Sequence, residues 1–372
     1  MKINSIGLTN FRNHEILSIN FNDPVTAIIG RNGLGKTNIV EAIHYAATLK
    51  SHRTHSDIPL IKQGSSSAFI NLVAQKHERI AAVSVTINRD SPNVFEVNNV
   101  TVRRAKDVVG IIKTVIFSPE DLALAKGDPA VRREFIDDFI IQNKPRMLDV
   151  KQNYERVLKQ RNSLLKSLIG KSLNTSSQET LFAWNEQLIK YGSELVEQRI
   201  KAITELRPFF EDFGNQISGS SEPLKISYQS SWLLTSEANT TQIQKEFESG
   251  LTSRQSEEVA RGQTLVGPHR DDISLELADM PVRNFASHGQ AWSVAIALRL
   301  ATFYVLRNLD TDPILILDDV FAELDANRRQ RLIACLTNVE QTIITVADEK
   351  DLPTELNATQ VWLPDGIVHA DN

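Results

Sequence analysis

The sequence predicts an α/β fold that a long helical insertion divides into two parts. Residues 1–118 read as short apolar strands around one helix, and the same mixture returns over residues 262–372. Between them, residues 119–261 are mainly helical, and the strand signal is nearly lost after Pro119. We therefore expect one α/β domain, split in sequence, with an inserted helical arm.

Composition narrows the class of protein. The chain has 372 residues, of which 41% are hydrophobic and 23% charged, as is usual for a globular protein of one large or two moderate domains. Its net charge of −5 argues against a wholly basic nucleic-acid binder but leaves room for local basic patches. Cys335 is the only cysteine, so no intramolecular disulfide can form. With no secretory signal and no membrane-length apolar run, we expect a cytoplasmic protein without a membrane partner.

A phosphate-binding loop is the strongest local motif. The apolar strand 25–29 leads into a Gly-x-x-x-x-Gly-Lys-Thr pattern, and residues 38–49 follow with helical spacing. The loop consists of Gly30, Arg31, Asn32, Gly33, Leu34, Gly35, Lys36 and Thr37. A strand, a glycine-rich loop and a helix start together aim backbone N–H groups at one point, which suits a polyphosphate. We expect Lys36 to reach the β/γ-phosphates and Thr37 to bind Mg²⁺.

The apolar run 313–317 ends in two carboxylates, Asp318 and Asp319. A central parallel strand buried on both faces reads this way, and ligands bind at its carboxyl end. We expect Asp318 to orient Mg²⁺ together with Thr37, and Asp319 to polarise the attacking water.

A further motif stands before this strand. Ser287, Gly289 and Gln290 open a long apolar helix over residues 291–306, with Ser287 as a plausible N-cap. A hydroxyl, flexible N–H groups and a helix dipole form another arrangement suited to anions. Glu323, Leu324 and Asp325 follow the Asp318–Asp319 pair.

The order of these four motifs is that of an ABC-type P-loop ATPase head. Heads of this class pair so that the signature helix of one completes the nucleotide site of the other, which implies an ATP-dependent homodimer. We expect Ser287, Gly289 and Gln290 to contact the γ-phosphate held by the partner's loop, and Asp325 to cross the same interface. The expected cofactors are ATP and Mg²⁺.

The inserted segment carries the pattern of packed helices. A long helix begins near Pro145, with Tyr154, Val157, Leu164 and Leu168 on one face. A second helix carries a short heptad seam of apolar residues, too brief to establish a coiled coil. Its members are Leu181, Trp184, Leu188, Tyr191 and Leu195. A short strand at 224–228 and a charged helix at 241–261 complete the insertion.

Several strings together resemble the RecF family, in the SMC/Rad50-like branch. They are Asn-Phe-Arg-Asn at 10–13, Ser-His-Arg-Thr at 51–54, Phe-Ser-Pro-Glu-Asp-Leu at 117–122, Arg-Arg-Glu-Phe-Ile-Asp at 132–137 and Gly-Pro-His-Arg-Asp-Asp at 267–272. The last is the most specific, and the resemblance covers essentially the whole chain. The insertion is also far shorter than the coiled coils of Rad50 and SMC proteins.

The resemblance implies ATP-dependent binding to single- and double-stranded DNA, dimerisation with ATP and slow hydrolysis. Family members act with RecR and RecO to place RecA on gapped DNA, in repair, replication and the SOS response, which implies a nucleoid-associated location. The motifs themselves support only the ATPase part of this expectation.

The chain departs from the related patterns at several places. The signature has His288 and continues with Ala291, Trp292 and Ser293, which puts the strength of the dimer interface in question. Asp319 stands where transporter ATPases have Glu, so hydrolysis is expected to be slow. No histidine follows the strand at 342–345, and Thr345 or Asp348 stays open for that switch role.

Local excesses of positive charge suggest where DNA binds. Residues 131–166 carry nine Lys or Arg against five acids, and 103–106 form a second small cluster. The DNA-contact candidates are Arg132, Arg133, Arg103, Arg104 and Arg53. A solvated helix face explains such charges equally well.

Two other functions stay open at this point. An ATPase subunit of an ABC transporter would need a membrane partner, and the helical arm counts against it. A clamp that ATP closes on DNA, with hydrolysis only resetting it, differs from the repair ATPase in what the hydrolysis is for.

Overall fold

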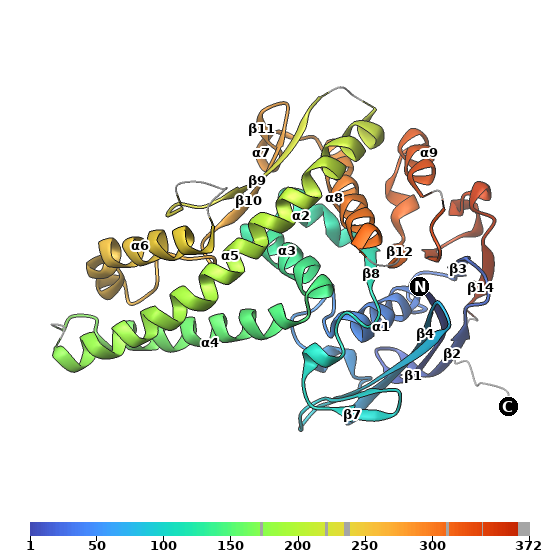
Figure 1. Ribbon diagram of the computed structural model, residues 1–372. Helices are drawn as coiled ribbons and strands as arrows, with labels where there is room; N and C mark the ends of the chain where they lie inside the picture. The colour runs from blue at the N-terminus through green and yellow to red at the C-terminus, as the bar shows by residue number, and fades with distance from the viewer. Residues whose placement is uncertain (172–173, 220–221, 234–238, 310–311, 337, 364–372) are drawn as a thin grey trace.

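The computed structural model describes residues 1–171, 174–219, 222–233, 239–309, 312–336 and 338–363. Its head contains two sheets around one helix, and long helices project from the head as an arm (Figure 1). The structure therefore has the α/β fold class that the sequence predicts.

A parallel sheet carries the nucleotide motifs. Its strands lie in the order β14 (Thr359–Trp362), β3 (Val25–Ile29), β13 (Thr342–Val346), β12 (Ile314–Asp318) and β8 (Thr114–Phe117). Alternate residues face opposite sides, so Ile314 and Ile316 of β12 join one core cluster while Leu315 and Leu317 join the other. A strand buried on both faces explains the unbroken apolar run that precedes Asp318.

An antiparallel sheet forms the other layer of the head. It consists of β2 (His14–Asn20), β1 (Lys2–Phe11), β4 (Ser67–Lys76), β5 (Arg79–Asn88), β6 (Val94–Val97) and β7 (Val100–Val102), in that order. Asn98 and Asn99 both have positive φ in the turn between β6 and β7, as expected for asparagines in a tight hairpin. Helix α1 (Lys36–Thr48) packs between the two sheets, with Ile39 and Ile43 buried.

The arm is built from α4 (Arg146–Ser167), α5 (Thr175–Ser218) and α6 (Thr240–Arg261). The predicted seam on α5 is observed, with Leu181, Leu188 and Leu195 buried and Trp184 and Tyr191 half-buried. The face predicted for α4 is correct except at one position. Tyr154, Val157 and Leu168 are buried as expected, whereas Leu164 is only half-buried and its neighbour Leu165 is buried instead. The arm thus packs as three helices, α6 lying against α5 beside α4.

The junction between arm and head contains helices and a small sheet. Helices α2 (Leu122–Lys126) and α3 (Pro129–Asn143) follow β8, and α7 (Val282–Phe285) precedes α8 (His288–Leu309). Strand β9 (Leu224–Gln229) pairs antiparallel with β10 (Asp272–Leu277), which also pairs with β11 (Met280–Pro281). This small sheet joins the expected arm segment, 119–261, to the expected C-terminal head segment, 262–372. The division into three segments, with 1–118 as the first, stays a prediction.

Buried ion pairs hold the arm helices to one another and to this junction. The Arg161 guanidinium is fully buried and donates to Glu258 at 2.6 Å and Thr264 at 2.7 Å. Arg199 of α5 pairs with Asp137 of α3 and donates to the carbonyl of Pro268 at 2.7 Å. The Gly-Pro-His-Arg-Asp-Asp string therefore has a structural role at this point of the fold.

Helix α8 crosses the core beneath the parallel sheet. It is long and apolar enough to span a membrane, but 78% of its most apolar window is buried inside the protein. Core packing against α5 and β8 accounts for its composition.

Candidate functional site

The phosphate loop connects β3 to α1, where the sequence places it. Gly33 and Gly35 both adopt positive φ, 91° and 96°, which lets the chain turn tightly into the helix. A Cβ on Gly35 would lie 2.4 Å from Asn13 Oδ1, so the neighbouring β1–β2 turn requires glycine there. The backbone therefore forms an open curve at the N-terminal end of α1, as phosphate binding demands.

Lys36 lies inside this curve and is only 4% exposed. Its ammonium group donates to the Gly30 carbonyl at 2.8 Å and lies 3.5 Å from the Asn32 side chain. A cation held by loop oxygens in this position can transfer its hydrogen bonds to phosphate oxygens with little movement.

Asp318 and Thr37 come together from opposite parts of the chain. The Thr37 hydroxyl donates to Asp318 Oδ1 at 3.1 Å, and the Thr345 hydroxyl donates to the same oxygen at 2.6 Å. Burial raises the pKa of Asp318 to about 6, and the neighbouring Asp319 carboxylate adds to that rise. Thr345, left open by the sequence as a switch residue, is thus a direct partner of Asp318.

Asp319 follows in a left-handed conformation, with φ 51°. Its N–H donates to the Thr345 hydroxyl at 3.0 Å, which fixes the turn at the end of β12. Partial burial raises the pKa of Asp319, while Lys36 opposes that rise. A carboxylate of raised basicity close to Lys36 suits the general-base role expected for it.

The donor groups fit a magnesium nucleotide. Mg²⁺ prefers hard oxygen ligands and binds through one or two protein groups together with phosphate oxygens. Thr37 and Asp318 supply a hydroxyl and a carboxylate oxygen in contact, beside the end of the phosphate loop. No group of three or more His, Cys, Asp or Glu forms a separate metal cluster in the described ranges.

The predicted signature residues form a capping box at the start of α8. The Gln290 N–H donates to the Ser287 hydroxyl at 3.2 Å, and the Ser287 N–H donates to the Gln290 side chain at 2.8 Å. Gln290 also donates to Glu222 at 3.3 Å. In a single head these polar groups therefore bond one another, and a partner's phosphate would have to replace some of those bonds. Their role across a dimer stays a prediction.

Asp325 caps α9 (Ala326–Cys335), accepting from the Arg328 N–H at 2.9 Å. Its carboxylate is about half exposed. It therefore lies at the surface, as a residue that crosses to a second head must.

The prediction that Arg132 contacts DNA is wrong for this structure. Its side chain is buried, forms two hydrogen bonds of 2.8–2.9 Å with Asp272, and donates to the Gly127 carbonyl. A buried guanidinium satisfied by a carboxylate and carbonyls holds α3 to β10 and is not free to neutralise a phosphate. Counting charges along the chain could not reveal this partner, which lies 140 residues away.

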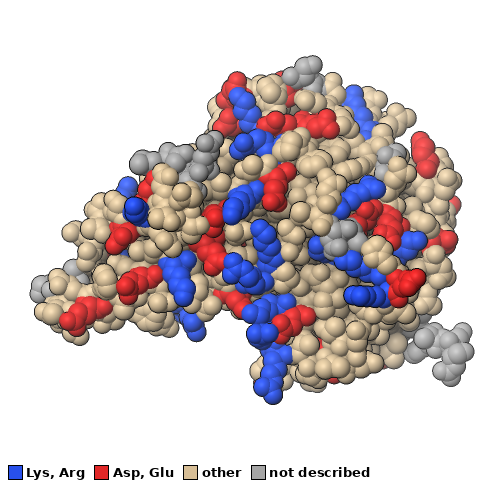
Figure 2. Space-filling model, viewed as in Figure 1, with Lys and Arg blue, Asp and Glu red and all other residues tan. Residues whose placement is uncertain are grey.

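The other four arginines remain accessible to different degrees. Arg103 and Arg104 are exposed after β7, where Arg104 pairs with Asp107. Arg133 is half-buried and donates to the Asp271 carbonyl at 2.7 Å. Figure 2 draws the molecule from the same side as Figure 1. On that face, Lys and Arg gather in a band over the middle, near the junction of arm and head, with Asp and Glu among them.

Arg53 belongs to a polar network that sequence reasoning did not find. It donates to Asn38 at 3.0 Å; Asn38 donates to Asn13 at 2.7 Å, and Asn13 to the Leu34 carbonyl at 3.1 Å. Arg53 also lies 3.7 Å from Glu120, just after β8. The two strings at 10–13 and 51–54 therefore support the phosphate loop through a chain of hydrogen bonds. In the sequence, the only sign of this network was that the two strings occur together.

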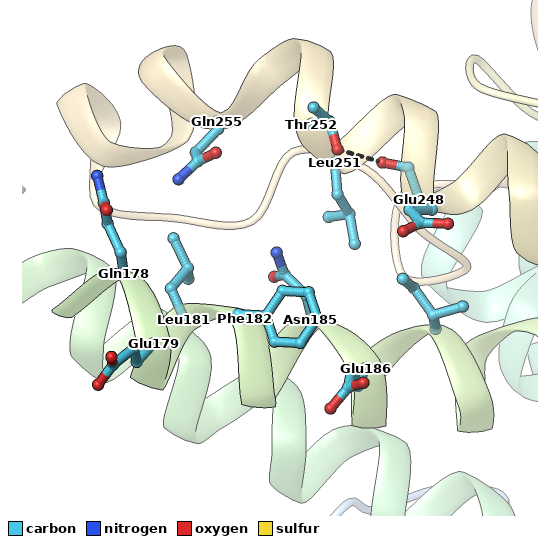
Figure 3. Close-up of a pocket in the computed structure, with 11 residues that line it drawn as sticks. Gln178, Glu179, Leu181, Phe182, Asn185, Glu186, Glu248, Leu251, Thr252 and Gln255 are labelled. Carbon is cyan, nitrogen blue, oxygen red and sulfur yellow. Dashed lines mark hydrogen bonds between the residues drawn. The ribbon is translucent and has the colours of Figure 1, made fainter. Parts of the chain in front are cut away.

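A hollow lies elsewhere, between α5 and α6 of the arm. It has a volume of about 580 Å³, and Leu181 and Leu251 point into it from the two helices (Figure 3). Glu179, Glu186 and Glu248 also line it. A groove with this acidic lining does not suit a polyphosphate, so cavity size does not identify the nucleotide site.

Comparison with known proteins assigns the chain to a family. The family model described as the RecF/RecN/SMC N terminal domain matches residues 2–361. The DNA replication and repair protein RecF of Streptomyces avermitilis is 40% identical over 375 residues, 99% of each chain. The chain belongs to the RecF family. The RecF protein of Acidothermus cellulolyticus is 42% identical over 359 residues, covering 95% of this chain and 96% of that one.

Solved structures agree with this assignment. The recombination mediator protein RecF-ATP of the RecFOR pathway superposes with a TM-score of 0.87 at 27% identity, covering 95% of this chain and 93% of that one. The Smc head domain of Pyrococcus furiosus, with an extended coiled coil and ScpA bound, gives a TM-score of 0.54 at 15% identity, covering 98% and 94%. The fold is thus the RecF and SMC head, which confirms the ABC-type α/β head expected from the sequence.

Proposed function

We propose that this RecF-family chain is an ATP-dependent DNA-binding protein of recombinational repair and replication. The observation that carries the proposal is the contact between Thr37 and Asp318. It joins the phosphate loop to the Asp318–Asp319 pair, which follows 281 positions later in the chain. The membership of the RecF family supports the DNA role, and a relative described as RecF-ATP supports ATP as the nucleotide.

The geometry suggests how the chain's groups act. Lys36 and the loop N–H groups bind the phosphates, and Thr37 with Asp318 would hold Mg²⁺, which would supply positive charge beside the phosphate oxygens. Asp319 polarises the attacking water. A partner head contributes Ser287, Gly289 and Gln290 to complete the site, with Asp325 at the same interface. Aspartate in place of glutamate fits a weak ATPase that DNA stimulates.

The remaining parts of the proposal rest on the family. ATP closes two heads on single- or double-stranded DNA, and the complex works with RecR and RecO to load RecA onto gapped DNA. The proposed location is the cytoplasm, at the nucleoid. Arg103, Arg104, Arg133 and Arg53 remain the proposed DNA contacts.

DNA affinity measured with and without ATP tests this function. We expect ATP to tighten binding to a gapped duplex in the native chain, and Lys36→Ala to remove that effect because the loop no longer holds phosphate. Asp319→Asn should still bind ATP but turn it over slowly, because the carboxylate expected to polarise the attacking water is lost. Equal DNA affinity with and without ATP in the native chain would refute the proposal.

The same variants separate the alternatives. If Asp319→Asn traps a tight complex, hydrolysis only resets a clamp; if it loses DNA binding as Lys36→Ala does, hydrolysis has a wider role. Turnover that DNA fails to stimulate would favour the transporter or another SMC-like head.

A further inference from the structure

Arg328 lies between the two elements that a second head would meet. It is the third residue of α9, which Asp325 caps, and its side chain reaches across to the start of α8. The Nη1 group donates to Asp325 Oδ2 at 2.5 Å, and the Nε group donates to the Ser293 hydroxyl at 3.1 Å. One guanidinium thus bonds both elements.

The contact with α8 is also steric. A Cβ built on Gly289 would lie 2.8 Å from both terminal nitrogens of Arg328, so the guanidinium rests directly against this glycine. Ser293 in turn donates to the Gly289 carbonyl at 3.1 Å. Ser293 is one of the positions at which the signature departs from the usual pattern, and here it supplies the acceptor for Arg328.

We propose that Arg328 is a positioning residue, which fixes Asp325 and the signature helix as one unit before two heads meet. We call Asp325, Arg328, Ser293 and Gly289 the arginine latch. This inference rests on the proposed ATP-dependent dimer and adds a residue outside the motifs of that site. The planar fork of arginine is suited to the task, since it bonds a carboxylate and a hydroxyl at fixed angles.

The latch acts by reducing the cost of association. Side chains that a partner head must meet lose conformational freedom on binding, and elements ordered in advance lose less. With Arg328 in place, Asp325 and the Ser287–Gln290 turn keep one relative position. Without it, each element is ordered separately when the dimer forms.

Dimer affinity and head-only nucleotide affinity, measured in parallel, test the latch. Arg328→Ala should leave the ATP affinity of the single head unchanged, because its guanidinium bonds to Asp325 and Ser293 and not to the phosphate loop. It should weaken ATP-dependent dimerisation about tenfold, because elements ordered in advance in the native head must then be ordered on association. Arg328→Lys should fall between, keeping the charge but not both bonds. Ser293→Ala should weaken the dimer in the same direction.

Gln330→Ala is the matched control, since Gln330 is exposed on the same helix. Hydrogen exchange of the nucleotide-free head adds a readout that needs no dimer: Arg328→Ala should speed exchange at residues 287–293, on a different element from the substitution. This result separates failure of the latch from failure of the dimer. Native dimer affinity in Arg328→Ala, tighter dimerisation in that variant, or unchanged exchange at 287–293 would overturn the proposal.

Discussion

At the scale of single residues, Asp318 illustrates the tension within the site. The Thr37 and Thr345 hydroxyls bond its Oδ1 atom, yet burial still raises its pKa to about 6. Since the proposed binding of Mg²⁺ requires the ionised form, the protein would maintain a carboxylate that is unfavourable without the metal. Function and stability therefore oppose each other at this residue.

This opposition makes a testable prediction about stability. Because burial gives Asp318 a higher pKa in the folded protein than in the unfolded chain, ionising this carboxyl lowers stability. The loss is absent below about pH 4 and complete above about pH 6. Asp318→Asn should therefore stabilise the nucleotide-free protein at pH 7.5 by up to roughly 3 kcal/mol, at about 1.4 kcal/mol per pKa unit. Thermal unfolding of both proteins from pH 4 to pH 8 measures this difference.

The gain should shrink as the pH falls toward 4, where the native carboxyl is protonated. Thr345→Val serves as a comparison, because it removes a donor to Asp318 without removing the charge. If Asp318→Asn is less stable than the native chain at pH 7.5, the hydroxyl bonds to the Asp318 carboxylate stabilise the fold by more than the burial of its charge costs.

At the scale of elements, α1 is fixed by the buried carboxylate of Glu41. Glu41 is fully buried, and Arg12 forms two hydrogen bonds with it, at 2.6 and 2.8 Å. The Ser51 hydroxyl donates to Glu41 at 2.5 Å. The strings at 10–13 and 51–54 thus converge on the helix that follows the phosphate loop, and set its position against β1.

Removing one partner of this pair should be costly. Arg12→Ala removes both short hydrogen bonds to the buried Glu41 carboxylate and leaves only the half-exposed Arg53, 3.7 Å away, as a counter-charge, so we expect a loss of up to about 3–5 kcal/mol in the free energy of unfolding. Arg104→Ala, which breaks an exposed pair with Asp107, should leave the free energy of unfolding almost unchanged. Urea unfolding of the two variants measures both values, and equal losses would contradict the assigned role of Glu41.

These elements also show what sequence can predict. The phosphate loop, β12 with its carboxylates and the seam of α5 were predictable, because each depends on spacing within a short segment. Arg132 was not, because its partner Asp272 is supplied by a strand beyond the arm. Arg328 gave no signal either, since its contacts with Ser293 exist only after α8 and α9 pack together.

At the scale of the whole molecule, the fold presents two sets of polar groups. The parallel sheet brings the phosphate loop and Asp318 together at the ends of its strands, while Ser287 and Asp325 precede α8 and α9. In the proposed dimer, the second set of one copy would complete the first set of the other. The arm is joined to the head by buried pairs such as Arg199 with Asp137, so it is not a loosely attached domain.

The central claim is that ATP joins two heads through the signature helix. Molecular mass in solution tests it most directly, measured without nucleotide, with ATP, and with ATP plus duplex DNA, for the native chain and for Ser287→Arg. We predict that ATP doubles the mass of the native chain and that DNA adds to the doubled species, while Ser287→Arg remains a single head that still binds ATP. A native chain that stays monomeric under all three conditions would contradict the account.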